Sequence, residues 1–288
     1  MFKKVKMKKI AIVSCNKWIG KITEDILLRD ALIQKGYDAE IISWEDKSID
    51  YSLYSAFILR SVWGYQNNYS EFKNWLLNLK HNNCLLFNSP DIVLNNIRKD
   101  KQFEILDDNN IPHIDTRFVY DRNSIGDIKS KTVIKPIISG SGENTHLISS
   151  SSDLESINLD FMSHMDNGIM IEPFIEEVKN GELSIIYIDG INTHSMVRYP
   201  GVFTEKKKPF LISDIPQEAY NLAKKVSNIK EFNGYLYMRV DMVMVDASPL
   251  IMEVELSEPD LLFKYVSDEK VKKDGINTLA SSLVRRMK

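Results

Sequence analysis

The first 95 residues alternate short apolar runs with segments of helical periodicity. The runs predict strands because they are short, apolar and ended by polar residues. They cover 10–14, 39–44, 56–60 and 85–87, with helical patterns between them at 25–35 and 72–79. Strands that alternate with helices predict a parallel, doubly wound α/β unit over residues 1–95.

From residue 96 on, the pattern changes to one helix and a series of short strands. The helix covers 101–110 and ends before Pro112, because proline cannot continue it. Short links between the later apolar runs favour antiparallel pairing in an α+β arrangement. The expected strands are 118–120, 132–134, 146–148, 169–171, 184–187, 193–197, 235–245 and 250–255.

Composition narrows the class of protein. The chain has 288 residues, 43% of them hydrophobic, which is ample for a buried core, and a net charge of −3. Without a basic field, nucleic acid is not expected as a partner. The only two cysteines, Cys15 and Cys84, are expected to be thiols in a reducing compartment. No apolar stretch approaches the roughly 20 residues that span a bilayer, and no secretory signal is recognisable, so we expect a soluble, cytoplasmic protein with no membrane partner.

A lysine followed by a glycine loop stands at the end of one predicted strand. The segment reads Lys135-Pro-Ile-Ile-Ser139-Gly140-Ser141-Gly142. A lysine at a strand end and a Gly/Ser loop can surround a phosphate with one cation and several backbone N–H groups. The segment lacks the Gly-Lys-Ser/Thr of a P-loop. Taken alone, it favours a hairpin turn beside a surface lysine.

The last two predicted strands carry charged residues at alternate positions. Arg239 and Asp241 share one face of the first strand, because side chains alternate along a strand. Glu253 and Glu255 likewise share one face of the next. If these strands pair, three carboxylates meet and need a cation. Mg²⁺ suits them because it takes oxygen ligands and leaves positions for phosphates. The alternative is a solvated polar face of an antiparallel sheet.

A strand that breaks at a proline lies between these two features. It contains Glu172-Pro173-Phe174-Ile175, and Glu182 follows. Backbone groups freed at the proline can read an adenine edge, and a carboxylate further on can accept ribose hydroxyls. A chain crossing between subdomains explains the segment equally well.

These features follow one another in an order that resembles the ATP-grasp superfamily. The order is Lys101 on its helix, Lys135 with its glycine loop, the Glu172 segment, Asp241, and then Glu253-Val-Glu255. Within the superfamily, the chain is similar to the glutathione synthetase-like and D-cycloserine synthetase-like ligases. The segment Arg60-Ser-Val-Trp63-Gly-Tyr65, followed by Tyr69-Ser-Glu-Phe72-Lys-Asn-Trp75, resembles the Arg-Ser-x-Trp-Asp-Tyr … Phe-x-x-Trp stretch of the D-cycloserine-type ligases.

The resemblance implies the ATP-grasp architecture, with ATP and Mg²⁺ as cofactors. Residues 1–95 would form an N-terminal substrate subdomain, 96–175 an ATP lid, and 176–288 an antiparallel C-terminal subdomain that binds Mg²⁺. Two lysines, Lys101 and Lys135, would hold the phosphates.

The resemblance also implies roles for other residues. The loop of Ser139, Gly140, Ser141 and Gly142 would cover the phosphates. The backbone of Glu172, Pro173, Phe174 and Ile175 would read adenine, and Glu182 would bind ribose. The Mg²⁺ ligands would be Asp241, Glu253 and Glu255.

Arg198 stands where the superfamily keeps a cation near the transferring phosphate, although it also reads as an ordinary arginine at a strand end. Arg60 and Ser61 are expected to contact substrate, because open α/β sheets bind ligands at the carboxyl ends of their strands. Two positions depart from the family patterns. Gly64 replaces an aspartate of the D-cycloserine-type stretch, and Ser184 stands where glutathione synthetases carry an arginine.

The expected function is ligation of a small, amino-acid-like carboxylate to an amine through an acyl phosphate, with release of ADP and phosphate. Lys135 and Arg198 would neutralise charge during the transfer. A peptide-tailoring ligase, a non-catalytic nucleotide-binding protein and a kinase-like phosphotransferase are the alternatives. The identities of the substrates stay open, and the resemblance allows a homodimer.

Overall fold

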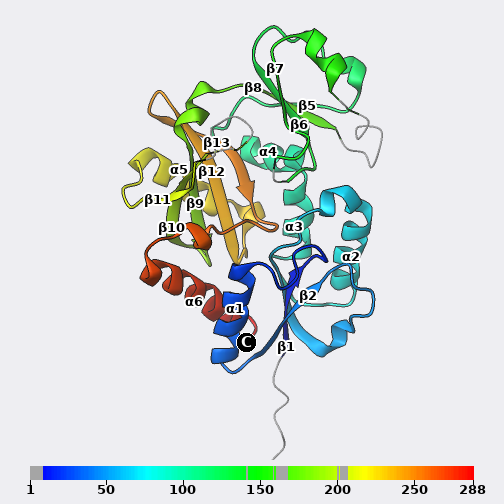
Figure 1. Cartoon of the computed structure of the whole chain (residues 1–288), viewed down its shortest axis with the longest axis vertical. Coiled ribbons are helices and arrows are strands. Elements are labelled where there is room, and N and C mark those ends of the chain that lie inside the picture. The colour runs from blue at the N-terminus through cyan, green and yellow to red at the C-terminus, as the bar shows by residue number, and fades with distance from the viewer. Residues whose placement is uncertain (1–8, 141, 158, 160–167, 200, 202–206) are drawn as a thin grey trace, which may run out of the picture.

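The computed structural model describes residues 9–140, 142–157, 159, 168–199, 201 and 207–288. The chain folds into three sheets that surround a central region, each built from a separate stretch of sequence (Figure 1). The mixed α/β and α+β fold class predicted from the sequence is confirmed.

The first sheet is parallel, as the alternation of strands and helices predicts. Its order is β2 (Asp38–Ser43), β1 (Lys9–Ser14), β3 (Tyr54–Leu59) and β4 (Leu86–Phe87). Alternate residues of β1 enter different cores. Ile10 and Ile12 pack with helix α1 (Thr23–Gln34), whereas Ala11 and Val13 pack with helix α2 (Tyr69–His81). Both faces of the sheet are therefore covered, as a parallel sheet requires.

A small antiparallel sheet follows. Its order is β5 (Arg117–Val119), β8 (Ile169–Pro173), β6 (Thr132–Pro136) and β7 (His146–Ile148). Ile134, Ile148 and Ile169 fill a separate small core on this sheet. Lys135 stands near the end of β6, directly before the glycine loop.

The third sheet is antiparallel and carries most of the charged residues predicted from the sequence. Its order is β11 (Phe210–Leu211), β10 (Ile191–Arg198), β9 (Glu182–Ile188), β12 (Tyr237–Val245) and β13 (Ser248–Glu255). The register sets Asp241 opposite Glu253 and Arg239 opposite Glu255. Helix α5 (Gln217–Ser227) packs on this sheet through Ala219, Leu222 and Ala223.

The sequence pattern did not resolve three of the helices, α3, α5 and α6. Helix α3 (Pro90–Ile97) begins with Ser89 as its N-cap and proline at its first position, which is a favourable start. Helix α4 (Lys99–Asp108) begins directly after it. The C-terminal helix α6 (Glu269–Arg286) lies beside α1, so the two ends of the chain share one core (Figure 1).

Buried amide side chains join α3 and α4 to the outer edge of β13. Asn96 donates to the Val254 carbonyl (2.6 Å) and accepts from the Leu256 N–H (2.7 Å). Gln102 donates to the same carbonyl (2.7 Å) and accepts from the Val254 N–H (2.8 Å). An edge strand exposes unpaired backbone groups, and these amides satisfy them.

We expect His194 to make the stability of the protein depend on pH. Burial lowers the pKa of His194 from 6.5 to about 4, although its hydrogen bond to the Leu261 carbonyl (2.7 Å) opposes that shift. The unfolded chain therefore binds the proton more tightly than the folded chain. As pH falls from 6.5 toward 4, this contribution to stability is lost, and His194 should contribute about 2 kcal/mol less to the free energy of unfolding at pH 5 than at pH 7.

Urea denaturation at pH 7 and pH 5 measures this difference. On going from pH 7 to pH 5, the wild type should lose about 2 kcal/mol more of its free energy of unfolding than the variant His194→Gln does. The variant His81→Gln, at an exposed site, serves as the control and should behave like the wild type. An unchanged pH dependence in His194→Gln would contradict this role.

Candidate active site

A cavity of about 660 Å³ lies where the three sheets meet. Its walls include Lys135 from β6, Glu182 from β9 and Glu253 from β13, together with Trp63 from the loop after β3. The cavity thus collects residues from every part of the chain, and many of them are charged.

Lys135 lies in the wall of this cavity, as the sequence predicts. Its ammonium group is 3.1 Å from a carboxylate oxygen of Glu172, which also accepts a hydrogen bond from Thr116 (3.3 Å). Burial alone would lower the pKa of Lys135, but the negative charges of Glu172 and Glu253 raise it. Lys135 therefore remains a cation inside the cavity.

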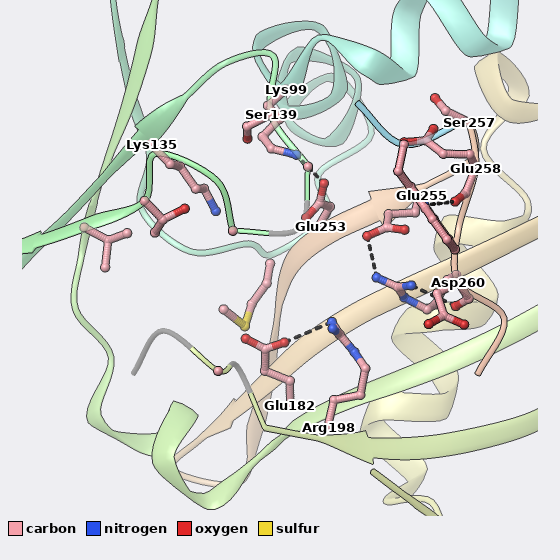
Figure 2. Close-up of a pocket in the computed structure, with 18 of the residues that line it drawn as sticks. Lys99, Lys135, Ser139, Glu182, Arg198, Glu253, Glu255, Ser257, Glu258 and Asp260 are labelled. Carbon is pink, nitrogen blue, oxygen red and sulfur yellow. Dashed lines mark hydrogen bonds and ion pairs between the residues drawn. The ribbon is translucent and has the colours of Figure 1, made fainter. Parts of the chain in front are cut away.

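Lys99 also lines the cavity, as does Lys264, whereas Lys101, which the sequence predicted at the phosphates, does not belong to the described lining. Lys99 is buried and pairs with Glu253, and Figure 2 shows the two side chains meeting. Lys101 is exposed and pairs with Glu104 (2.6 Å) on the outside of the same helix. Two residues along a helix are roughly 200° apart, so only one of the two lysines can face inward.

The glycine loop borders the cavity. Ser139, Gly140 and Gly142 line it, while Ser141 lies outside the described residues. Glu143, which follows the loop, accepts a hydrogen bond from Gln66 of the N-terminal unit (2.8 Å). This bond connects the loop to the opposite wall.

One wall is apolar and contains the proline break. Phe174 and Ile175 line it with Pro173, directly after the buried carboxylate of Glu172. The cavity is also lined by Ile114, Val133, Val178 and Met252, which are apolar. Such a wall fits a flat aromatic ring, and Glu172 stands at its border.

Arg198 connects two of the predicted carboxylates. Its guanidinium group lies 3.0 Å from Glu182 and 2.7 Å from Asp241, and its Nε donates to the Ser184 hydroxyl (2.7 Å). Ser184 in turn donates to Asp241 (2.6 Å). An arginine at position 184, as in glutathione synthetases, would add a positive charge here. Ser184 instead orients the charged side chains of Arg198 and Asp241. Burial raises the pKa of Glu182, and Arg198 opposes that shift.

The sequence analysis named Arg239 but gave it no role. Arg239 is buried, pairs with Asp241 (2.8 Å) and Glu255, and donates to the Asp260 carbonyl (2.8 Å). Its guanidinium group also lines the cavity. The available signal was its position two residues from Asp241, which puts both side chains on the same strand face.

The three carboxylates predicted to bind metal lie around this arginine. Burial would raise the pKa of Asp241, but Arg198 and Arg239 hold it down at about 2. Burial raises the pKa of Glu255 to about 8, and the nearby charges of Glu253 and Asp241 add to that shift. Burial would raise the pKa of Glu253, but the charges of Lys99 and Lys135 lower it.

These carboxylates fit Mg²⁺ by their chemistry rather than by their present arrangement. Glu253 and Glu255 supply oxygen ligands at the cavity wall, and Asp241 is buried and does not belong to the described lining. Among the described residues, no group of three or more His, Cys, Asp or Glu side chains is arranged around a common point as metal ligands. The reason is that each carboxylate turns toward a lysine or arginine.

Arg60 and Ser61 are not found in the lining of the cavity, contrary to the prediction that they contact substrate. Ser61 donates to Asp25 (2.5 Å), and Arg60 pairs with Glu24 (3.5 Å) in a buried network. The strand end is covered by the C-terminal part of the chain, and the Arg60 guanidinium lies 5.4 Å from the Tyr237 ring centre. From this loop, Trp63 and Tyr65 line the cavity instead.

The backbone conformation at position 64 explains why this chain has a glycine where the family pattern has an aspartate. Its φ is +105°, a backbone conformation that side chains disfavour. Its N–H donates to the Gln66 side chain (3.0 Å), the same residue that binds Glu143. The glycine thus shapes the turn that reaches the glycine loop.

Comparisons with known proteins agree with this geometry. Residues 10–88 match the family model of the N-terminal domain of D-cycloserine synthetase DcsG. Residues 115–246 match the model of the ATP-grasp domain of prokaryotic glutathione synthetase. The cycloserine biosynthesis protein DcsG of Streptomyces lavendulae is 24% identical over 290 residues, which cover 91% of this chain and 93% of that protein.

Solved structures show the same fold. The crystal structure of D-cycloserine synthetase DcsG matches with a TM-score of 0.80 and 20% identity, over 97% of this chain and 100% of that one. D-alanine–D-alanine ligase from Bacillus anthracis, complexed with ATP, matches with a TM-score of 0.69 and 16% identity, over 97% and 96%.

Fold, cavity and family matches together identify the chain as an ATP-grasp ligase, an enzyme class that uses ATP. Within this superfamily it is similar to D-cycloserine synthetase DcsG, both in its N-terminal domain and over more than nine-tenths of its length. Among the described residues, no helix is long and apolar enough to cross a bilayer.

The two lysines of α4 allow a matched test of the cavity assignment. We expect Lys99→Met to weaken binding of a non-hydrolysable ATP analogue about 10- to 100-fold, because a charge-assisted contact to phosphate is lost. Lys101→Met should change the affinity less than twofold. Titration calorimetry measures both variants, and a thermal melt confirms that each is folded. Equal losses in the two variants would refute the assignment.

Proposed function

We propose that the protein activates a small, amino-acid-like carboxylate as an acyl phosphate and joins it to an amine, releasing ADP and phosphate. The observation that carries this proposal is the meeting of four cations with a carboxylate cluster in one cavity. These four cations are Lys99, Lys135, Arg198 and Arg239, and a fifth lining cation, Lys264, pairs with Asp260. Bringing a carboxylate to the γ-phosphate joins two negative groups, so such a reaction needs this concentration of positive charge.

The apolar wall supports binding of the adenine of ATP. Phe174 and Ile175 offer apolar surface and backbone groups, and the glycine loop borders the same cavity. Lys99 and Lys135 would hold the phosphates between them. Glu182, expected at the ribose, would have to exchange its pairing with Arg198 for that contact.

Asp241, Glu253 and Glu255 would hold Mg²⁺ at this site. When bound, the metal supplies positive charge to the phosphate oxygens. Binding requires these carboxylates to turn from their present partners, Lys99 and Arg239, toward the ion. The lysine and arginine would then be free to contact phosphate oxygens.

Arg198 and Arg239 would stabilise the charge that develops during the reaction. Arg198 donates to the Ser184 hydroxyl and Arg239 donates to the Asp260 carbonyl, so both guanidinium groups would keep a partner when Asp241 turns toward the ion. Guanidinium groups that are positioned before the reaction lose little energy to reorganisation when charge develops. These two arginines are thus suited to the phosphoryl transfer and to the tetrahedral state formed when the amine attacks.

The size of the cavity supports small substrates over a peptide acceptor. About 660 Å³ falls within the roughly 300–1,000 Å³ of small-molecule sites. The complete set of charges also argues against a protein that only binds nucleotide.

Product analysis tests the proposed function. With Mg·ATP, we expect ADP and phosphate to appear only when a suitable carboxylate and amine are present, among D- and L-amino acids, sugar acids and amines. AMP and pyrophosphate would refute the acyl phosphate and indicate adenylation. A stable phosphorylated product without amine incorporation would indicate a kinase.

A metal titration tests the carboxylate cluster. In Glu253→Gln, we expect the Mg²⁺ concentration for half-maximal activity to rise about tenfold, because an anionic ligand becomes neutral. Glu71→Gln, at an exposed residue of α2 that pairs with Lys47, is the matched control and should leave the titration unchanged. An unaltered curve for Glu253→Gln would place the metal elsewhere.

A further inference from the structure

The base of the glycine loop after β6 is anchored in the N-terminal unit. Ile137 and Ile138, which lead from Lys135 into the loop, are buried in the core that this unit forms around α2. The Ile137 carbonyl accepts a hydrogen bond from the Lys99 N–H (3.2 Å) at the start of α4. The base of the loop therefore has a defined position relative to both lysines of the phosphate end.

Beyond this base, the loop contacts a second part of the N-terminal unit. The N–H groups of Glu143 and Thr145 donate to the carbonyls of Gly140 (3.1 Å) and Gly142 (3.2 Å), which line the cavity. The Glu143 carboxylate accepts from Nε2 of Gln66 (2.8 Å). A Cβ on Gly140 would lie 4.0 Å from Oε1 of Gln66, so the Gln66 side chain also lies close to the loop backbone.

Both ends of the Gln66 amide are used. Its Oε1 accepts from the Gly64 N–H (3.0 Å), while its Nε2 donates to Glu143. Gly64 has a φ of +105°, a conformation that glycine adopts without steric cost. An amide whose acceptor is fixed presents its donor in a defined direction. The turn at Gly64 therefore orients Gln66 toward the glycine loop.

The same turn also forms part of the opposite wall of the cavity. Trp63 and Tyr65 line the cavity, and the Trp63 indole N–H donates to the Glu258 carbonyl in the loop after β13 (3.3 Å). The Trp63 carbonyl accepts from the Cys15 thiol (3.2 Å). These contacts fix the turn, so Gln66 connects the glycine loop to a wall that is itself held in place.

We propose that Gln66 is a positioning residue: through its hydrogen bond to Glu143, called the latch here, it holds the glycine loop against the phosphates of the bound nucleotide. Gln66 does not belong to the described lining and acts through the backbone of Gly140 and Gly142. This inference rests on the proposed function, because that function puts the phosphates between the loop and the two lysines. A loop that covers a ligand must open before the ligand leaves, so losing the latch should speed nucleotide release.

The dissociation rate of a fluorescent, non-hydrolysable ATP analogue, measured with Mg²⁺ by stopped flow, tests this role. Gln66→Leu removes the hydrogen bond without adding a charge and should raise the rate about 3- to 10-fold, because Glu143 is exposed and the bond is of modest strength. Gln34→Glu, at an exposed residue of α1, should stay within about 1.5-fold of the wild type. A rate for Gln66→Leu within the same limit would overturn the latch.

An exchange of the two side chains separates the hydrogen bond from a general effect of charge. Gln66→Glu alone puts two carboxylates together and should raise the dissociation rate at least as much as Gln66→Leu. In the double variant Gln66→Glu/Glu143→Gln, the amide donates in the opposite direction and the net charge is unchanged. Its rate should return to within about twofold of the wild type. A rate equal to the product of the two single effects would show that the side chains do not interact, and would refute the latch.

Hydrogen exchange distinguishes a positioned loop from a change in overall stability. With the analogue bound, the N–H groups of Glu143 and Thr145 should exchange about 3- to 10-fold faster in Gln66→Leu than in the wild type, because their turns open more often. Exchange in helix α5, on the third sheet, should be unchanged. Faster exchange in α5 as well would assign Gln66 to the stability of the whole chain and contradict the positioning role.

The outcomes separate this inference from the proposed function. Faster release in Gln66→Leu that the double variant reverses, without ADP formation from any carboxylate and amine, would support the latch and contradict the ligase reaction. Formation of ADP and phosphate with a carboxylate and an amine, together with wild-type release rates in Gln66→Leu, would support the ligase reaction and refute the latch.

Discussion

The outer edge of β13 is the constraint on which the arrangement of the cavity depends. This strand ends its sheet, and its backbone groups would otherwise lack partners. Amides of Asn96 and Gln102 satisfy Val254 and Leu256, while Asn88 donates to the carbonyls of Tyr237 (2.9 Å) and Leu256 (2.6 Å). Because buried polar groups must be paired, the helices that carry these amides can sit in only one position. That position brings Lys99, which lies between Asn96 and Gln102, against Glu253 of the same strand.

Charge pairing is the second organising feature. The cavity wall is crowded with ionised groups, and all of its described carboxylates except Glu258 are matched by a lysine or arginine. Such pairs are costly to bury and contribute little net stability. These ion pairs are better explained as part of a binding site in which the charged side chains exchange one another for a charged ligand. On the proposed function, a nucleotide with its metal would replace these internal pairs with external ones of the same charge.

The departures from the family patterns are local adjustments to this network. Ser184 removes a charge from the centre of β9, but its hydroxyl bridges Arg198 and Asp241 and keeps both oriented. Gly64 permits a turn at positive φ whose next residues include Gln66, the partner of the glycine loop.

The sequence by itself determined the classes of sheet, because residues that alternate or repeat along a strand or helix report directly on which face is buried. It also determined the carboxylates on β12 and β13, since strand periodicity alone puts Asp241 and Glu253 on known faces. It missed α3 and assigned the phosphate lysine to Lys101, because where α4 begins depends on the backbone of β13, more than 140 residues away. It expected Arg60 and Ser61 at the substrate, but the C-terminal part of the chain covers that strand end. Only tertiary structure decided these points, and only it showed which of the described carboxylates have a lysine or arginine partner, because pairing between distant side chains leaves no pattern in a single sequence.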